Sequence, residues 1–333
     1  MKHLRRWAIG LVITLATLVG IVSFQPYTPA QTEADLTLEV AGLTLEELAD
    51  GVYGLIASTD FPPADMTNTA ICNGGIVIGS DGVLVVDPFQ NEALANLLFA
   101  TVASLTDQPI RYVVNTHYHF DHSGGNTAAD AFGHPILGRG PIRELMLTNN
   151  LELDPNPTPP DVIVHGAGEL WLGDRSVQLA EFDGHTGGTD LVVYLPDEDV
   201  LMAGDLLFTQ RFPYAADGNL RVWQVNLEQL ATTYPTATIL PGHGPVSDRT
   251  DLETLQGYLD YLETLALQWQ ADGVSQEAAI EQTMIPDAYA DYLFQGLFPS
   301  NLTTAYQQIT LGQDDAAAIQ THFAAQPPEF QAL

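Results

Sequence analysis

The feature that most restricts this chain is the segment N-T-H-Y-H-F-D-H-S-G-G-N at residues 115–126. It places three histidines and one aspartate within six positions, in a chain with nine histidines altogether. The segment I-R-Y-V-V at residues 110–114, rich in β-branched and aromatic residues, comes directly before it and predicts a strand. Residues two apart in an extended chain point to the same face, so His117 and His119 can both reach one metal ion.

Asp121 and His122 follow at a turn, which the sequence Ser123-Gly124-Gly125 indicates. At this turn both side chains can face a second ion beside the first. Neutral imidazole and carboxylate ligands together favour zinc, with iron and manganese as the alternatives. Two ions sharing one loop would therefore explain why so many ligands are crowded together.

Three further candidate ligands stand at glycine-containing turns after apolar runs: His185, Asp205 and His243. Their settings are D-G-H-T-G-G-T-D, L-M-A-G-D-L-L-F and L-P-G-H-G-P. Glycine beside each residue lets the backbone approach a crowded site. One such histidine alone would be an ordinary loop residue, but the recurrence of the setting favours a shared site. The remaining histidines lack it: His3, His134, His165 and His322.

This ordered series resembles the metallo-β-lactamase-fold hydrolase superfamily, of the glyoxalase II-like binuclear zinc type. The signature of that family is H-x-H-x-D-H followed by separate His, Asp and His ligands, and the likeness runs from about residue 45 to residue 246. The resemblance implies an α/β fold, the αββα metallo-β-lactamase sandwich, with the metals at one edge of two packed sheets. It also implies ligands for the first metal (His117, His119, His185), for the second metal (Asp121, His122, His243) and for both (Asp205).

The resemblance further implies a reaction. A hydroxide bridging two zinc ions would cleave an ester, thioester, lactone or lactam, with Asp121 as the catalytic residue that orients the nucleophile and carries a proton. Secreted β-lactamases of this fold usually lack an aspartate at the place of Asp205. Glyoxalase II proteins have that aspartate, but they carry basic residues in a helical tail, where this chain has only Arg249 after His243. A β-lactamase proper and a non-catalytic metal-binding partner of a periplasmic redox system remain as alternatives.

Several residues outside the ligand series are also candidates for the site. Asp87 ends the strand V-L-V-V-D and matches a family aspartate that orients a metal ligand, with a turn cap as the alternative. Phe61 and Met66 stand where family members place a flap over the metals, with a plain hairpin loop as the alternative. Arg211 and Arg221 are candidates for holding a substrate carboxylate, with a structural ion pair as the alternative.

The charge of the chain restricts its partners. The formal net charge is −32, and Lys2 is the only lysine. Such a surface repels phosphate backbones, so we expect a small-molecule substrate and no nucleic acid. Cys72 is the only cysteine, which excludes an intrachain disulfide.

The start of the chain predicts export. Three basic residues within the first six positions precede an uncharged, mostly apolar run at residues 7–24. We therefore expect residues 1–30 to be a signal peptide or an N-terminal membrane anchor, and the protein to be periplasmic or extracellular, and membrane-anchored if this segment is retained.

The rest of the chain divides into a linker, a metallo-β-lactamase-fold domain and a C-terminal helical extension, at residues 31–44, 45–249 and 250–333. Within the domain, apolar runs between turn residues predict strands and helical spacing predicts helices. We expect strands at 52–57, 70–78, 83–86, 110–114 and 237–240, and helices at 91–105, 141–149 and 227–234, the last with Asn226 as its N-cap.

Overall fold

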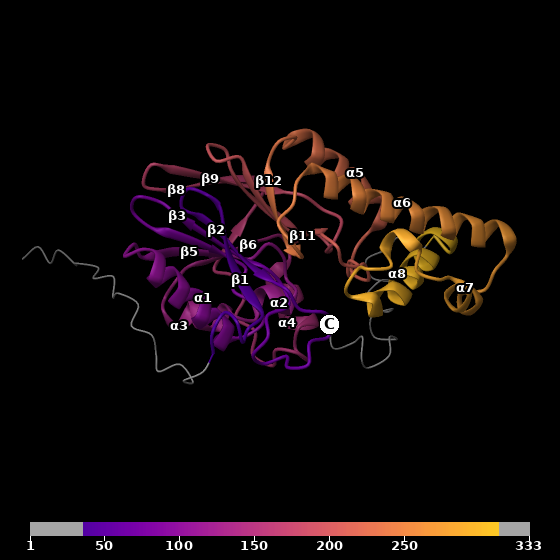
Figure 1. Cartoon of the computed structure of the whole chain (residues 1–333), viewed down its shortest axis with the longest axis horizontal. Helices are drawn as coiled ribbons and strands as arrows, with labels where there is room; N and C mark the ends of the chain where they lie inside the picture. The colour runs from indigo at the N-terminus through magenta and orange to yellow at the C-terminus, as the bar shows by residue number, and fades with distance from the viewer. Residues whose placement is uncertain (1–35, 313–333) are drawn as a thin grey trace, which may run out of the picture.

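The computed structural model describes residues 36–312 of the chain (Figure 1). The predicted export segment at residues 1–30, most of the expected linker and the last part of the C-terminal extension lie outside the described residues. Among the helices between residues 36 and 312, none combines the length and the apolar character needed to cross a membrane.

The first half of the chain forms a seven-stranded sheet in the order β1-β2-β3-β4-β5-β6-β7. The pairs from β1 to β4 are antiparallel, and the pairs from β4 to β7 are parallel. The runs G-G-I-V-I and V-L-V-V are almost entirely buried, as expected of strands covered on both faces. The strands are β1 Leu43–Ala49, β2 Val52–Ala57, β3 Gly74–Ile78, β4 Val83–Val86, β5 Ile110–Val114, β6 Ile136–Arg139 and β7 Val162–Val164.

The second half forms a five-stranded sheet in the order β12-β11-β10-β9-β8. Its pairs are antiparallel except for β11 and β12, which are parallel. All nine residues of β11 are buried. The strands are β8 Ala167–Leu172, β9 Arg175–Glu181, β10 Leu191–Leu195, β11 Val200–Phe208 and β12 Thr238–His243.

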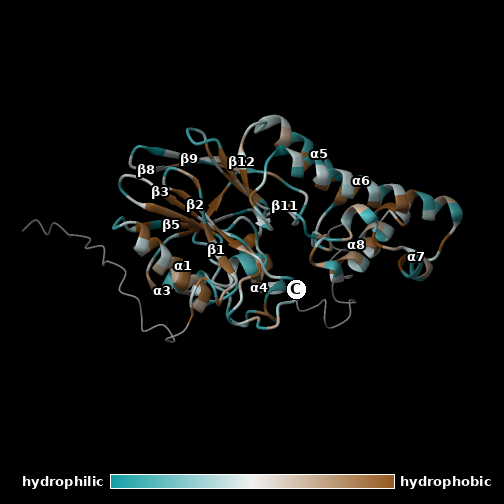
Figure 2. Ribbon diagram, viewed as in Figure 1, coloured by the Kyte–Doolittle hydropathy of each residue, from teal (hydrophilic) through white to brown (hydrophobic). Residues whose placement is uncertain are grey.

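The two sheets pack face to face over a shared apolar core, to which the first sheet contributes Val77 and Leu84 and the second contributes Val193 and Met202. Gly75 allows the close approach, because a Cβ at this position would lie 2.5 Å from Sδ of Met202. In Figure 2 the central strands are brown, whereas α5 and α6 alternate between teal and brown. This pattern is that of buried sheets between amphipathic helices.

Helices cover the outer face of each sheet, which gives the expected αββα sandwich (Figure 1). The first sheet is covered by α1 Glu92–Leu105 and α3 Asn126–Ala131, and the second by α5 Leu220–Thr233 and α6 Arg249–Asp272. Side-chain caps begin the long helices: Asn91 accepts a hydrogen bond from Leu94 N, and Asp248 accepts one from Thr250 N.

The C-terminal region packs against the second half of the sandwich. It contains α6, α7 Gln276–Gln282, α8 Phe298–Ala305 and the π-helical turn Tyr306–Thr310. Leu259, Phe298 and Leu302 belong to the same buried cluster as Leu201 of β11 and Trp223 of α5. The extension is therefore continuous with the core that supports the second sheet.

Three sequence predictions of local structure were wrong. Helix α5 begins at Leu220 after the cap Asn219, well before the predicted start at residue 227, because Leu220 and Trp223 are buried against the second sheet. Asn226 lies inside this helix and donates to the carbonyl of Asp183. Strand β3 begins at Gly74 and not at residue 70, and β1 begins at Leu43, inside the segment predicted as linker.

Candidate metal centre

The ends of strands from both sheets position the predicted ligands at one edge of the sandwich. Strand β5 leads directly into the loop that carries His117 and His119, and the single-turn helix α2 Phe120–Ser123 carries Asp121 and His122. From the second sheet come His185 in the turn after β9, Asp205 within β11 and His243 as the last residue of β12. All seven are buried.

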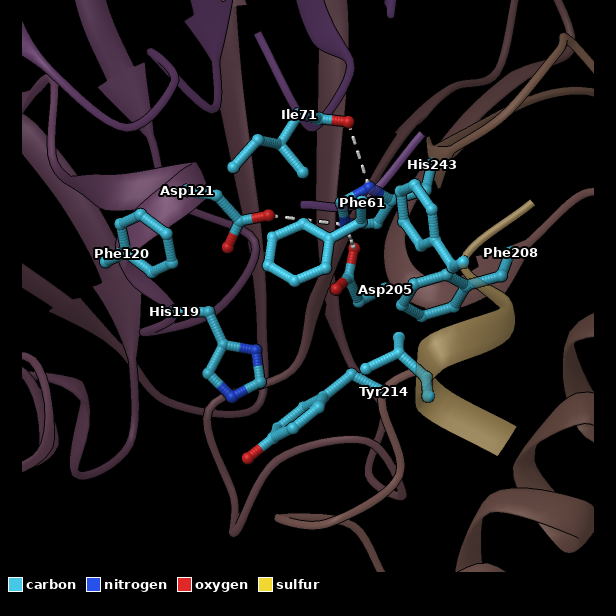
Figure 3. A pocket seen from close by; sticks show the side chains of 11 residues that line it. Phe61, Ile71, His119, Phe120, Asp121, Asp205, Phe208, Tyr214 and His243 are labelled. Atoms are coloured by element: carbon cyan, nitrogen blue, oxygen red, sulfur yellow. Dashed lines mark hydrogen bonds and ion pairs between the residues drawn. The ribbon is translucent and has the colours of Figure 1, made fainter. Parts of the chain in front are cut away.

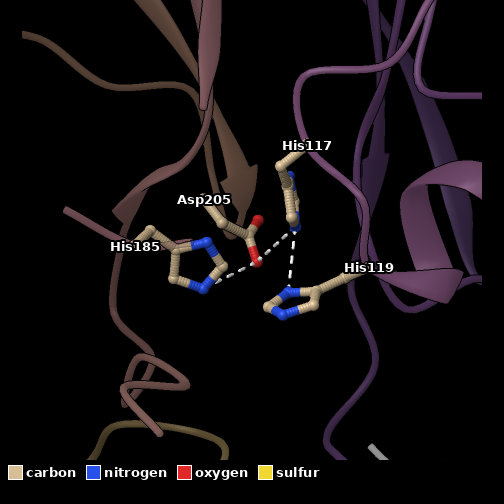
Figure 4. Close-up of side chains that lie close together, drawn as sticks. All are labelled: His117, His119, His185 and Asp205. Carbon is tan, nitrogen blue, oxygen red and sulfur yellow. Dashed lines mark hydrogen bonds and ion pairs between the residues drawn. The ribbon is translucent and has the colours of Figure 1, made fainter. Parts of the chain in front are cut away.

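His117, His119, His185 and Asp205 form the first group, with one ligand atom from each within 4.8 Å of the others (Figure 4). Nε2 of His117 lies 3.1 Å from Nδ1 of His119 and 3.6 Å from Oδ2 of Asp205. Nε2 of His185 lies 3.7 Å from the same carboxylate oxygen.

His122, Asp205 and His243 form the second group by the same criterion. Oδ1 of Asp205 lies 3.0 Å from Nε2 of His122 and 3.3 Å from Nε2 of His243. Asp121 joins this group, because its Oδ2 lies 3.5 Å from Nε2 of His122 and 3.3 Å from Nε2 of His243. The two oxygens of Asp205 therefore face different groups of histidines.

These distances fit zinc. Ligand atoms about 2.0–2.2 Å from a tetrahedral zinc ion stand roughly 3.3–3.6 Å from one another. Among the described residues, neither ring nitrogen of His185 has a hydrogen-bond partner, although both atoms are buried. Buried polar atoms need a partner, and a metal ion at the first group would supply one to the ring.

The electrostatics of the site also favour cations. Burial lowers the pKa of His117 well below its ordinary value, which keeps the ring in the neutral form that binds metal. Burial alone would lower the pKa of His122 too, but the carboxylates of Asp205, Asp121 and Asp87 raise it well above that value. Burial would raise the pKa of Asp205, yet the surrounding histidines hold it well below its ordinary value.

Asp87 lies beside the second group, as predicted for a residue that orients a ligand. Its Oδ2 lies 2.8 Å from Nδ1 of His122, so Nε2 of that ring faces Asp205. The same carboxylate accepts hydrogen bonds from the backbone N–H and the hydroxyl of Thr116. The contact therefore fixes both the ring orientation and the start of the ligand loop.

A cavity opens onto the two groups (Figure 3). Side chains of His119, Asp121, Asp205 and His243 line its polar part. The other lining residues are apolar or aromatic: Phe61, Ile71, Phe120, Phe208, Tyr214, Phe294 and Leu297.

Of the predicted substrate contacts, Phe61 lines this cavity, and Met66 and Arg211 do not. Met66 packs against the core cluster of the second half. The buried guanidinium of Arg211 donates to the carbonyl of Ala57 at 3.0 Å. Arg221 forms an ion pair with Glu263 at 3.1 Å, which is the structural role weighed as its alternative.

The family model for the metallo-beta-lactamase superfamily matches residues 68–243, which is more than half of the chain. The chain belongs to the metallo-β-lactamase superfamily. The matched range ends on the last predicted ligand, His243, and includes the other six.

Relatives within this superfamily are hydrolases. A hydroxyacylglutathione hydrolase of Anaeromyxobacter dehalogenans is 33% identical over 147 residues, which cover 44% of this chain and 48% of that protein. The probable metallo-hydrolase YqgX of Bacillus subtilis is 27% identical over 217 residues, or 59% of this chain and 94% of the relative. This chain thus spans about half of the first protein and nearly all of the second.

A solved structure of this superfamily has the same fold. The metallo-beta-lactamase from Pontibacter korlensis matches with a TM-score of 0.56 and 24% identity, over 66% of this chain and 99% of that one. The remaining third of this chain lies outside that match.

The sequence did not predict two loop residues, Asp217 and Asp190, that contact candidate metal ligands. Oδ2 of Asp217 lies 3.0 Å from Nε2 of His119 and accepts a hydrogen bond from the Tyr118 hydroxyl. Asp190 accepts from the backbone N–H of His185 at 3.0 Å. The only signal for either was a common type of turn sequence, A-A-D-G-N and T-G-G-T-D, which many loops share.

Cys72 also lies beside the second group. Its thiol donates to the backbone carbonyl of Asp121 at 2.9 Å, and its Sγ lies within 4.8 Å of ligand atoms of Asp121 and His122. Burial, followed by the nearby carboxylates, raises the pKa of this thiol well above its ordinary value. In this protonated form Cys72 serves as a hydrogen-bond donor to the ligand loop.

Proposed function

We propose that this protein is an exported binuclear zinc hydrolase that cleaves an ester, thioester, lactone or lactam bond. The observation that carries the proposal is the position of Asp205, whose two carboxylate oxygens face two separate groups of histidines. The apolar start of the chain, residues 7–24 behind three basic residues, supports export.

His117, His119 and His185 would hold one ion, Asp121, His122 and His243 the other, and Asp205 both. Zinc, when bound, lowers the pKa of water to near neutrality and polarises a carbonyl oxygen. The side chains of the protein position the reacting groups. Asp121 lines the cavity and contacts His243, so its carboxylate can orient a nucleophile and take up its proton.

The residues around the ligands hold this arrangement. Asp87 and Asp217 contact the nitrogens of His122 and His119 that point away from the ligand cluster, which fixes both rings. The aromatic side chains Phe208 and Tyr214 line the cavity and exclude water from part of it. A structural zinc site closes with four protein ligands, whereas this cluster opens onto a cavity, which supports an enzyme over a non-catalytic metal binder.

A panel hydrolysis assay on the zinc-loaded chain tests the proposal. The panel contains nitrocefin, lactones, aryl esters, thioesters and aryl phosphodiesters, and we expect turnover of at least one carbonyl substrate that is lost in Asp121→Asn. Absence of zinc-dependent turnover across the panel would count against a hydrolase. Turnover of nitrocefin alone would favour a β-lactamase proper.

A further inference from the structure

We infer that the substrate is an uncharged carboxylic ester, open-chain or lactone, whose apolar acyl group packs on a wall made jointly by the loop after β2 and the C-terminal region. The inference rests on the proposed hydrolase function and names the substrate class of the same site.

Two rings from distant parts of the chain build this wall. Phe61 and Phe294 pack edge to face with centroids 5.8 Å apart, and both line the cavity. Oδ1 of Asp60 accepts hydrogen bonds from the backbone N–H of both residues, at 2.8 Å and 2.7 Å. One carboxylate oxygen therefore fixes both aromatic residues against each other.

Phe294 sits in a strained backbone. Its φ of 62° lies in the left-handed region that residues with a side chain rarely adopt. Its ring also packs 5.4 Å from the ring of His243, a ligand of the second group. Strain of this kind is retained where the surrounding structure holds the residue in place, and here it directs an aromatic ring from the C-terminal region toward the metal centre.

The cavity has both polar and apolar lining residues. Carboxylates and imidazoles of the candidate metal ligands line it together with Phe61, Phe294 and Leu297, which the loop after β2 and the C-terminal region contribute. An ester carbonyl placed at the ligands would thus extend its acyl group along apolar side chains. Burial of that group stabilises the complex by the hydrophobic effect.

No lysine or arginine stands among the residues that line this cavity in the described part of the chain. Arg211 contacts the site only indirectly: its guanidinium carbon lies 5.6 Å from the centroid of the Phe294 ring, and it is bound to the carbonyl of Ala57. A carboxylate packed on Phe61, Phe294 and Leu297 would therefore lose its hydration without gaining a cation from the chain.

Two p-nitrophenyl esters of similar length test the charge preference on the zinc-loaded full chain: the butyrate and the hemisuccinate, which ends in a carboxylate. We expect kcat/KM for the butyrate to exceed that for the hemisuccinate by about tenfold or more. In Phe61→Arg, at a partly exposed position, this preference should shrink by about tenfold because a cation now faces the acyl group. Equal rates on both esters would overturn the inference.

A second set of variants tests the wall itself. In Phe294→Ala, kcat/KM for p-nitrophenyl hexanoate should fall about tenfold, with less than about a threefold change for the acetate. Asp60 is exposed, and Asp60→Ala keeps the rings of Phe61 and Phe294 while removing the carboxylate that holds them. This variant should show the same selective loss even if Phe294→Ala fails to fold. Leu267→Ala, at an exposed position of α6, serves as the control. A uniform loss on both esters in Asp60→Ala would contradict a role in acyl recognition.

Binding of unreactive ligands separates this inference from the proposed function. Calorimetry would compare an alkyl trifluoromethyl ketone with the same ketone carrying a terminal carboxylate. Preferred binding of the uncharged ketone without any ester turnover would support the apolar site and reject hydrolysis. Ester turnover combined with preferred binding of the anionic ketone would reject only the apolar site.

Discussion

The carboxylate of Asp217 lies 3.0 Å from Nε2 of His119, although the two residues are 98 positions apart in the chain. His119 presents its other ring nitrogen, Nδ1, to His117 within the first ligand group. Burial by itself would raise the pKa of Asp217, but the hydrogen bond to His119 lowers it below its ordinary value. A charged carboxylate therefore holds the ring and increases its basicity as a ligand.

We predict that Asp217→Asn weakens zinc at the first position about 10–100-fold, because the ring of His119 loses a charged partner. Competition with a chromophoric chelator measures this affinity. Asp81→Asn is the matched control, since Asp81 forms a partly exposed pair with Arg111 and contacts none of the candidate ligands by an ion pair, and it should change neither the affinity nor the stability by more than about 1 kcal/mol. Unchanged zinc affinity in Asp217→Asn would mean that this contact does not support the metal.

The packing around Gly125 explains why the ligand segment contains a glycine at this position. A Cβ at this position would lie 2.0 Å from the carbonyl oxygen of Pro88 and 2.7 Å from Cβ of Ala95. Gly125→Ala should therefore lower the free energy of unfolding by about 1–3 kcal/mol, through displaced backbone. Gly257→Ala on α6, where no atom stands within 4 Å of the new Cβ, should instead raise it by about 0.5–1 kcal/mol. Denaturant unfolding measures both, and a neutral Gly125→Ala would contradict the close packing of this loop.

His134 should make stability depend on pH. Burial lowers its pKa from 6.5 to about 4, and its ring packs edge to face on Phe99 and stacks on Phe132. The folded protein keeps His134 neutral while the unfolded chain takes up a proton, so stability is complete above about pH 6.5 and falls as the pH drops toward 4.

Between about pH 7.5 and pH 4.5, the free energy of unfolding should fall less in His134→Gln than in the unchanged protein. The expected difference is about 1–2 kcal/mol, which is less than the full pKa change would give because the ring is partly exposed. Denaturant unfolding at both values measures the difference. The exposed His165, changed to Gln, should retain the original dependence. An identical loss in His134→Gln and in the unchanged protein would contradict the buried neutral ring.

The clustering of most candidate ligands was predictable because they follow strand-like runs at turns, and strand ends of packed sheets meet at one edge. Asp205 differs from the prediction, since it lies within β11 and not at a turn after a strand. The shared orientation of His117 and His119 could be predicted from their spacing of two residues in an extended chain alone. Asp217 was not predictable, because its contact with His119 depends on how a loop after β11 folds back over the site.

The start of α5 shows why local patterns misplaced a helix. Asn219 and Asn226 both precede apolar residues and both are good N-caps. The earlier start is chosen because Leu220 and Trp223 are buried against the second sheet, which is a tertiary contact. The same holds for Phe294, whose place in the cavity wall follows from packing of the C-terminal region and from its hydrogen bond to Asp60.

The most direct test of the metal centre is the zinc content of the purified chain and of Asp205→Ala, measured by elemental analysis after reconstitution. We predict two zinc ions per chain in the unchanged protein. In Asp205→Ala we predict close to one, because His117, His119 and His185 still hold the first ion while the second loses the carboxylate oxygen that faces His122 and His243. Activity should fall by orders of magnitude with the fold retained. Two tightly held zinc ions and near-normal turnover in Asp205→Ala would contradict a bridging role for Asp205.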